Sequence, residues 1–352
     1  MNDIQTLIQD WHDPVLGLKP FAKQKITFAD GILTLVTGFP CTLEHTRLEA
    51  AVRALLAEHG IAVKKIRFQV NIKAHAVQAG LKPLPGVKNI IAVASGKGGV
   101  GKSTLSVNLA IALSQQGANV GLLDADLYGP SQAMMLGGAT APDTLDGKTI
   151  QPVWRHGLQT LSIGDLVTED TAMIWRGPMV TQTLMQLLSE CQWHELDYLV
   201  IDLPPGTGDT QLTLAQQIPV AGAVIVTTPQ EIALLDAKKA KTMFDKVSIP
   251  VLGLVENMSH YRCPNCGHEA HIFGHDGGKA LAARYQLPLL GQIPLDPGIR
   301  AQADQGNPTA AADPHGELAR LYQTIAARTA AQLASRQKSF TQAFPKIVVE
   351  RG

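Results

Sequence analysis

Residues 96–103, with the sequence GKGGVGKS, fit the pattern G-x-x-x-x-G-K-[ST] and constrain the fold more than any other segment. The apolar run before them, residues 89–95, predicts a buried strand, and apolar side chains at helical spacing predict a helix over residues 103–116. Strand, glycine-rich loop and helix form the context in which this pattern binds nucleotide phosphates. Because glycines lack a Cβ, their backbone N–H groups can turn toward phosphate oxygens. We therefore predict a phosphate-binding loop; a glycine turn that binds nothing is the alternative.

The side chains of this loop have separate predicted roles. Lys102 is expected to reach the β- and γ-phosphates, and the Ser103 hydroxyl is expected to bind Mg²⁺. Lys97 is a second cation inside the loop, and a buried cation needs an anionic partner, which the nucleotide supplies. The residues of this segment predicted to bind ATP are Gly96, Lys97, Gly98, Gly99, Val100, Gly101, Lys102, Ser103 and Thr104.

Beyond residue 88, short apolar runs alternate with segments of helical periodicity. This alternation predicts a mainly parallel sheet covered by helices on both faces, the doubly wound α/β fold of P-loop NTPases. Its functional residues should lie at the carboxyl ends of the strands. The predicted strands after the loop are residues 118–123, 198–201, 221–227, 251–255 and 289–293, and the predicted helices are residues 178–190, 209–217, 231–246, 276–285 and 316–334.

The first 75 residues predict a separate, small α+β domain. Two β-prone runs around an Asp-Gly pair predict a hairpin over residues 26–39. An apolar stripe ended by Gly60 predicts a helix over residues 43–59, and residues 61–72 alternate like a strand. We expect domains at residues 1–75 and 89–335, a linker containing Pro and Gly at 76–88, and a loose tail at 336–352.

Carboxylates follow two of the predicted strands. Asp124 and Asp126 come directly after strand 118–123, and Asp202 follows strand 198–201. We expect Asp126 to orient the attacking water, Asp124 to support the Mg²⁺ shell, and Asp202 to hold Mg²⁺ directly or through water. Capping of the next helix is the alternative role for the first two residues.

Two further loops are predicted to lie beside the nucleotide. Residues 203–209 place two prolines before two glycines, which suits a loop that senses the γ-phosphate, an ordinary turn being the alternative. Asn257 follows strand 251–255, and its amide offers the donor and acceptor that match the edge of adenine. From local sequence alone, a plain turn asparagine is almost as well supported.

The chain has four cysteines, and two of them form a C-x₂-C motif at Cys263 and Cys266. Two thiolates at this spacing can bind one metal, but a metal site normally needs four ligands. His268 and His271 are too close in sequence to the cysteine pair to complete the site readily, and Cys41 and Cys191 are distant from it in sequence. A twofold dimer would supply four thiolates, enough for a [4Fe–4S] cluster or a zinc ion. A free surface pair is the alternative.

Charge and hydropathy limit the partners. Lys+Arg and Asp+Glu both number 30, and a neutral chain carries no broad field for a nucleic-acid backbone. No apolar run of about 18 residues predicts a membrane-spanning helix, and residues 1–5 lack the basic and apolar regions of a signal peptide. We therefore expect no nucleic acid, no membrane and a cytoplasmic location.

Together, these motifs resemble those of the Mrp-type iron–sulfur cluster carriers, ApbC-like P-loop ATPases with a deviant Walker A loop. The resemblance implies ATP binding and hydrolysis, a homodimer with a cluster bridging its subunits, an assembly scaffold as partner, and delivery to apo iron–sulfur proteins. It further implies that Lys97 reaches the partner's nucleotide, that Lys97, Lys102 and Asp126 are catalytic, and that Asn257 contacts the base. It rests on residues 96–103, 124–131, 175–179, 197–209, 256–259 and 293–296 and on the cysteine pair; residues 175–178 have no predicted role.

Residues 1–75 resemble the small domain of iron–sulfur assembly factors, in which a Thr-rich turn with a cysteine precedes a helix. Residues 37–42, TGFPCT, occupy that place, although Thr42 stands where a proline usually follows the cysteine. Cys41 is therefore a candidate for cluster handling, but a lone cysteine is more often an inert small residue.

Four other functions are compatible with parts of this pattern. A DNA-partitioning ATPase would want a basic surface, and a septum-positioning ATPase would want a basic amphipathic C-terminal helix, which Pro345 interrupts here. A nitrogenase-reductase-like electron donor bridges its cluster from two cysteines far apart in sequence. A zinc-bridged scaffold ATPase is the hardest alternative to exclude, because Cys-Pro-x-Cys-Gly is also a zinc knuckle.

Overall fold

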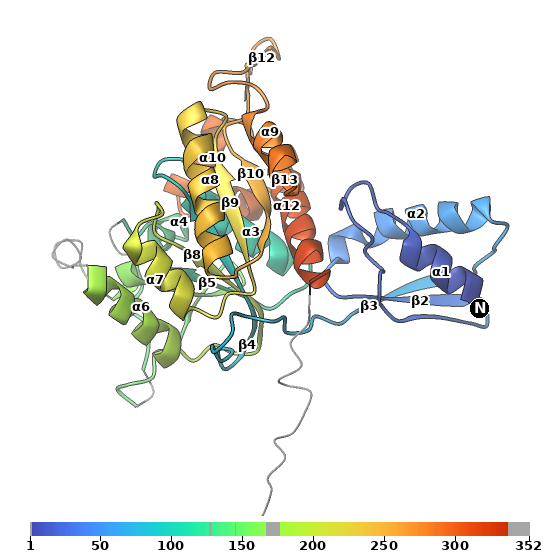
Figure 1. The fold of residues 1–352 in the computed structure, drawn as a ribbon, viewed down its shortest axis with the longest axis horizontal. Coiled ribbons are helices and arrows are strands. Elements are labelled where there is room, and N and C mark those ends of the chain that lie inside the picture. The colour runs from blue at the N-terminus through green and yellow to red at the C-terminus, as the bar shows by residue number, and fades with distance from the viewer. Residues whose placement is uncertain (1, 127–128, 145, 167–176, 337–352) are drawn as a thin grey trace, which may run out of the picture.

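The computed structural model describes residues 2–126, 129–144, 146–166 and 177–336, and an eight-stranded sheet is its main element (Figure 1). The strand order is β13-β10-β9-β4-β8-β5-β7-β6, and every neighbouring pair is parallel except β6 and β7. The strands are β4 (Val87–Ser95), β5 (Val120–Asp124), β6 (Val153–Arg155), β7 (Leu158–Ser162), β8 (Leu196–Asp202), β9 (Gly222–Thr227), β10 (Val251–Glu256) and β13 (Leu289–Gln292).

Helices cover both faces of the sheet, so its central strands carry buried apolar side chains on both sides. Along β4, Ile91 and Val93 join one buried cluster, whereas Ile90, Ala92 and Ala94 join the other. Residues of α3 (Lys102–Gln115), α4 (Gln132–Met135), α10 (Pro297–Asp304), α11 (Thr309–Ala312) and α12 (Glu317–Ala334) belong to the first cluster, and residues of α6 (Gly177–Glu190), α7 (Asp209–Gln217), α8 (Glu231–Lys246) and α9 (Gly277–Arg284) belong to the second.

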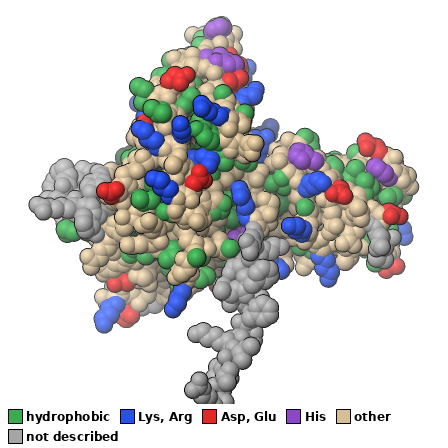
Figure 2. All heavy atoms as spheres, in the orientation of Figure 1, with side chains coloured by type: hydrophobic (Ala, Val, Ile, Leu, Met, Phe, Trp, Pro, Cys, Tyr) green, Lys and Arg blue, Asp and Glu red, His purple; other side chains and the backbone are tan. Residues whose placement is uncertain are grey.

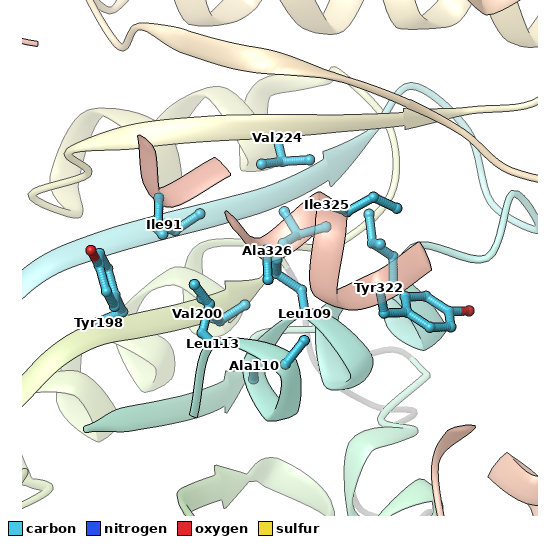
Figure 3. Close-up of a cluster of buried hydrophobic side chains, with 14 of the residues drawn as sticks. Ile91, Leu109, Ala110, Leu113, Tyr198, Val200, Val224, Tyr322, Ile325 and Ala326 are labelled. Carbon is cyan, nitrogen blue, oxygen red and sulfur yellow. The ribbon is translucent and has the colours of Figure 1, made fainter. Parts of the chain in front are cut away.

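The first cluster fixes the position of α3, the helix that follows the phosphate loop (Figure 3). Ile91, Val200 and Val224 come from three neighbouring strands and face Leu113 of α3 and Ala326 of α12, and all five side chains are fully buried. Because buried apolar surface is the main source of folding free energy, this packing holds α3 against the central strands of the sheet.

The predicted fold class is confirmed, since each of the five predicted strands coincides with a parallel strand of this sheet. The prediction lacks β6 and β7. In β7 every side chain is buried, polar ones included, so the sequence shows neither a continuous apolar run nor an alternation of apolar and polar residues. Gln159 donates to the carbonyl of His194 at 2.9 Å, and Thr160 donates to that of Val153 at 2.8 Å. The prediction also lacks α1 (Asn2–Asp10) and the short helices α4, α10 and α11.

The N-terminal residues form a second, three-stranded sheet with its own core. β1 (Ile26–Ala29) and β2 (Ile32–Thr37) form the predicted hairpin, and β3 (Lys65–Val70) is parallel to β2. Asp30 and Gly31 both have positive φ angles, which the tight turn between β1 and β2 requires. α2 (His45–Glu58) packs on this sheet through Val52 and Leu56. The predicted domain limits stay a proposal; β4 begins at Val87, inside the predicted linker.

The turn that contains Cys41 packs against the larger unit. Thr42 N–H donates to the carbonyl of Gln116 at 3.1 Å, and Leu43 N–H donates to the side-chain oxygen of Gln116 at 3.0 Å. Cys41 is fully buried and belongs to the cluster that surrounds α3 and α12. Burial raises the pKa of its thiol to about 11. A buried thiol with a raised pKa is a poor nucleophile and metal ligand, which favours the packing role of Cys41 over cluster handling.

Among the described residues, none of the helices is both long and apolar enough to cross a membrane. The predicted tail, except Arg336, lies outside the described residues, and a cytoplasmic location stays a prediction.

Candidate functional site

The phosphate loop joins β4 to α3 and depends on its glycines. Gly99 and Gly101 have φ angles of 78° and 82°, in the left-handed region that favours glycine. At Gly96, a Cβ would collide with the backbone of Asp236 in α8, so the loop can approach that helix only without a side chain. The Val100 side chain is buried in the core, so Val100 can contribute only its backbone groups to a ligand of the loop. The local geometry is therefore that of a phosphate-binding loop.

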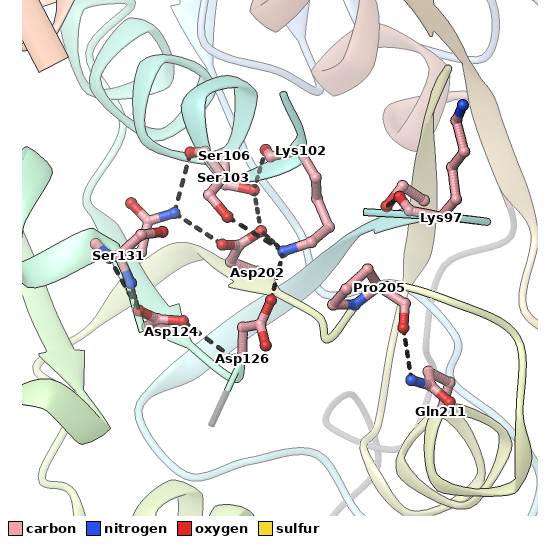
Figure 4. A network of polar contacts seen from close by, with 12 residues as sticks. Lys97, Lys102, Ser103, Ser106, Asp124, Asp126, Ser131, Asp202, Pro205 and Gln211 are labelled. Atoms are coloured by element: carbon pink, nitrogen blue, oxygen red, sulfur yellow. Dashed lines mark hydrogen bonds and ion pairs between the residues drawn. The ribbon is translucent and has the colours of Figure 1, made fainter. Parts of the chain in front are cut away.

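Three predicted side chains from separate segments meet beside this loop (Figure 4). Nζ of Lys102 lies 2.6 Å from Oδ1 of Asp202 and 3.8 Å from Oδ2 of Asp126. It also donates to Oγ of Ser103 at 3.3 Å. The lysine is only 6% exposed, so its charge and those of the two carboxylates act on one another with little screening by water.

Asp202 is held by side chains that the sequence prediction does not include. Oδ1 of Asp202 accepts from the Ser106 hydroxyl at 2.8 Å, and Oδ2 accepts from Nε2 of Gln132 at 2.9 Å. Gln132 also donates to the carbonyl of Ser103 at 3.0 Å. Ser106 follows Lys102 by four residues on α3, a spacing that puts both on one face of a helix and could have identified it. Gln132 gives no such local signal.

Asp124 lies next to Asp202 in the register of β5 and β8, but its oxygens face the loop that follows β5. Oδ1 accepts from the N–H of Asp126 at 3.1 Å, and Oδ2 accepts from the N–H groups of Ser131 and Gln132, both at 3.0 Å. Burial, followed by the charge of Asp202, raises the pKa of Asp124 to about 7. Asp124 therefore organises the loop that carries Asp126; its support of a Mg²⁺ shell stays a prediction.

Lys97 points away from this cluster, although it belongs to the same loop (Figure 4). Its Nζ donates to the side-chain oxygen of Gln230 at 3.2 Å, and Gln230 precedes the first turn of α8. Its ammonium group is thus displaced from the side of the loop where Lys102 meets Asp202. This placement agrees with the prediction that Lys97 acts outside its own phosphate site but does not test it.

A cavity of about 500 Å³ opens beside the loop. This volume lies within the range of roughly 300–1,000 Å³ that is typical of small-ligand pockets. Asn257, Met258 and residues 294–296 also line it. Predicted site residues that line it are Gly98, Gly99, Gly101, Lys102, Ser103, Thr104, Asp126 and Asn257.

The cysteine pair lies on a small two-stranded ribbon, formed by β11 (Tyr261–Arg262) and β12 (Glu269–Ala270), at one end of the molecule (Figure 1). Cys263 N–H donates to the carbonyl of His268 at 2.9 Å, and Gly267 N–H donates to that of Cys263 at 2.9 Å, which closes the turn. Backbone N–H groups, that of Cys266 first and then that of Asn265, stabilise the thiolate and lower the pKa of Cys263. A lowered pKa favours the thiolate that binds metals.

No third ligand joins the pair within the part of the chain that the structure describes, where no three His, Cys, Asp or Glu side chains are grouped to hold a metal. Histidine side chains gather near the ribbon (Figure 2): the ring centroids of His271 and His275 are 4.2 Å apart, and those of His260 and His271 are 6.3 Å apart. Cys191 lies in the other core cluster, where burial raises its pKa to about 12. Only Cys263 and Cys266 remain at the surface, with two ligands for a site that needs four.

The family model described as ParA, NUBPL iron-transfer P-loop NTPase, matches residues 86–330. The chain belongs to this family. An iron-sulfur cluster carrier protein of Pseudomonas fragi is 55% identical over 269 residues, which cover 76% of this chain and 94% of that protein. The mouse iron-sulfur cluster transfer protein NUBPL is 46% identical over 285 residues, 80% of this chain and 88% of that protein. The predicted resemblance is thereby confirmed.

Solved structures of the same fold agree with this membership. A nucleotide-binding protein of Archaeoglobus fulgidus in complex with ADP has a TM-score of 0.56 and 39% identity, covering 63% of this chain and 88% of that one. The cell division ATPase MinD of Pyrococcus furiosus has a TM-score of 0.52 and 25% identity, covering 68% of this chain and 97% of that one. The family match favours the NUBPL-type carriers over the partitioning, septum-positioning and electron-donor alternatives.

The family match also covers two segments of the predicted resemblance whose roles the structure does not test. Trp175 and Arg176 lie outside the described residues, and Gly177 and Pro178 begin α6. The segment 203–209 follows β8 and places Pro205 on the wall of the cavity, with its carbonyl accepting from Gln211 at 2.7 Å. Its predicted sensing of the γ-phosphate stays a prediction.

Proposed function

We propose that this P-loop NTPase binds and hydrolyses ATP and carries a [4Fe–4S] cluster between two subunits, from an assembly scaffold to apo iron–sulfur proteins. The observation that carries the proposal is the ribbon with two surface thiols, which no further ligand joins among the described residues. A second copy of the same ribbon would complete a four-thiolate site. The names of the relatives, cluster carrier and cluster transfer protein, support a cluster as the cargo.

The geometry beside the loop supports ATP as the nucleotide substrate. Lys102 would exchange the carboxylate of Asp202 for the β- and γ-phosphates, and the loop N–H groups at the start of α3 would bind the remaining phosphate oxygens. Asn257, which lines the cavity together with Met258, would contact the adenine. Asp126 lines the cavity and would orient the attacking water.

The donors near Ser103 fit Mg²⁺. The Ser103 hydroxyl and the Asp202 carboxylate both lie close to Nζ of Lys102, and oxygen atoms of this kind are the ligands that Mg²⁺ prefers. When bound, Mg²⁺ would neutralise charge on the β- and γ-phosphates. Gln132 and Ser106 would orient the Asp202 carboxylate through their hydrogen bonds to it.

The surface beside Lys97 fits contact with a second copy. Ile232 and Leu235 lie on the first turns of α8, next to Gln230, and are 70% and 54% exposed. Their spacing of three residues puts both on one face of the helix. Large apolar side chains exposed together mark contact surfaces, and a contact here would bring Lys97 to the partner subunit.

We expect Lys97→Ala to lose ATP hydrolysis while keeping its fold, because its ammonium group would act on the partner's nucleotide. Asp126→Ala should also be inactive, but a mixture of the two variants should regain part of the activity. In a hybrid dimer one composite site keeps both side chains. Activity is measured on heterodimers isolated with two different affinity tags. Absence of rescue in a confirmed hybrid would place the action of Lys97 within its own subunit.

Cluster carriage is tested by transfer. The anaerobically reconstituted protein, mixed with an apo iron–sulfur acceptor enzyme, should activate the acceptor, and Cys263→Ala should not. Cys191→Ala should transfer normally, because Cys191 is a buried core residue far from the ribbon in the sequence. A zinc-bridged scaffold, the remaining alternative, would take up zinc and leave the acceptor inactive.

A further inference from the structure

The segment between β10 and β11, residues 257–260, connects the phosphate loop to the cysteine ribbon. At its start, Nδ2 of Asn257 donates to the carbonyl of Val100, inside the phosphate loop, at 2.9 Å. At its end, Tyr261 begins β11, and Cys263 directly follows that strand. One short segment therefore contacts the loop and carries the cysteines.

The contact between Asn257 and the loop is close on both sides. A Cβ at Gly101 would collide with Nδ2 of Asn257, so the side chain packs directly on the loop backbone. The backbone N–H of Asn257 also donates to the carbonyl of Thr227 at 2.8 Å, at the end of β9. A change in the path of the loop must therefore act on Asn257, which the sheet holds from the other side.

Residues 259 and 260 are paired with the chain that follows β13. The backbone N–H and the hydroxyl of Ser259 both donate to the carbonyl of Ile293, at 3.0 and 3.1 Å. Leu295 N–H donates to the carbonyl of His260 at 2.7 Å. The ribbon therefore extends from two hydrogen-bonded segments, residues 257–260 and 293–295. Because displacing one segment alone would break these bonds, we expect the two to shift together.

This pair of segments has open volume on two sides. The nucleotide cavity lies on one side of residues 294–296, and a second cavity of about 400 Å³ lies on the other, bordered by His260, Arg262 and Glu269 of the ribbon. Close-packed interiors resist displacement, so chain between two cavities can shift at lower cost. Met258, on the nucleotide side, has a φ of 55°, a strained conformation for a residue with a side chain.

We propose that Asn257 is a positioning residue that couples the phosphate loop to the cysteine ribbon, so that a nucleotide in the loop changes the exposure of Cys263 and Cys266 within one subunit. The inference rests on nucleotide binding, as proposed above, and holds for either metal. Because coupling between two binding sites is reciprocal, metal on the ribbon changes nucleotide affinity by the same factor.

The test follows thiol reactivity in the metal-free protein with the reagent DTNB, with and without saturating Mg-ADP. Cys41 and Cys191 are buried, so the rapidly reacting thiols report on the ribbon. In the wild type, Mg-ADP should change their rate by roughly fivefold or more. The change should be the same at all protein concentrations, because it arises within one subunit. ADP binding is measured separately by calorimetry.

Two variants separate the coupling from nucleotide binding. In Asn257→Ala, the ribbon thiols should react with DTNB at nearly the same rate with and without saturating ADP. Ser259→Ala removes the side-chain bond to Ile293 but does not border the nucleotide cavity, so ADP affinity should persist while the effect of ADP shrinks. Asn119→Ala is the matched control: Nδ2 of Asn119 also donates to a backbone carbonyl, that of Glu195, and this variant should behave as the wild type.

Each remaining outcome counts against the coupling. A wild-type rate that ADP leaves unchanged, with ADP shown to be bound, overturns it. So does a full ADP effect in both Asn257→Ala and Ser259→Ala. An effect that grows with protein concentration places its origin at a contact between subunits. Failure of the wild type to bind ADP removes the proposed nucleotide site, and the coupling with it.

Discussion

Replacing Lys102 by alanine should lower ATP hydrolysis by a factor of roughly 100 or more, the loss typical of removing one charge-stabilising donor from an active site. Its ammonium group lies beside Ser103, Asp126 and Asp202, where the phosphates and Mg²⁺ are expected. Lys102 is the only lysine among the described residues that line the cavity; the other cation of that lining is Arg300, which belongs to α10 and not to the phosphate loop. The measurement is phosphate release at saturating ATP, together with ADP affinity by calorimetry.

Lys88→Ala is a matched control for this change. Lys88 also forms an ion pair with an aspartate of β8, Asp197, at 2.7 Å, but at the opposite end of β4 and β8. Its removal should leave hydrolysis unchanged. Hydrolysis by Lys102→Ala within twofold of the wild type would contradict the assignment of the phosphate loop.

The same substitution should also lower stability, because Asp202 is fully buried. Breaking a buried ion pair by removing one partner costs about 3–5 kcal/mol, and the bonds from Ser106 and Gln132 should reduce that cost here. Adding Asp202→Asn to Lys102→Ala should recover part of the free energy of unfolding in urea, since the unpaired charge is gone, but no hydrolysis. This comparison separates the chemical role of the lysine from its structural role.

The parts of the site that sequence predicts are those whose chemistry is local. The loop, Lys102 and Ser103 are contiguous, and Asp202 ends an apolar strand whose neighbour in the sheet is β4. A parallel sheet brings the carboxyl ends of its strands together, so the meeting of Lys102 with Asp202 and Asp126 follows from the fold class alone.

Other parts depend on how distant segments close on one another. Gln132 reaches Asp202 and Ser103 from the loop after β5. The carboxylate of Asp124 holds that loop in place by accepting hydrogen bonds from its backbone N–H groups. Cys41 resembles a functional cysteine in its local sequence, yet the packing of its turn against α3 buries it. Neither result is encoded in a short motif, because hydrogen-bond partners and burial are set by tertiary contacts.

The second large effect concerns the cysteine pair. After anaerobic reconstitution, iron and sulfide should scale as one [4Fe–4S] cluster for every two chains, because each ribbon supplies two thiolates and the cluster takes four ligands. Cys263→Ala and Cys266→Ala should each remove the cluster completely, since either change leaves two thiolates at the shared site. The measurement is iron and sulfide per chain, combined with mass by light scattering.

Controls on the same protein separate loss of ligands from loss of fold. Both cysteine variants should still bind ADP, because the ribbon contributes no cysteine to the nucleotide cavity. Cys191→Ala should keep the full cluster content, since its thiol is buried and its pKa is raised, so it is a poor ligand. Both results are required before the loss in the ribbon variants can be assigned to the metal site.

The ratio of metal to chain distinguishes the proposals. One cluster per chain would need ligands beyond the two surface thiols, and within the described residues no group of three or more candidate side chains provides them. Iron and sulfide that survive both alanine changes would exclude the ribbon as the cluster site. A colourless protein that binds one zinc for every two chains, even after reconstitution with iron and sulfide, would keep the shared four-thiolate geometry but make the protein a zinc-bridged dimer. The symmetry argument and the identity of the metal are therefore tested by the same preparation, through two independent readings.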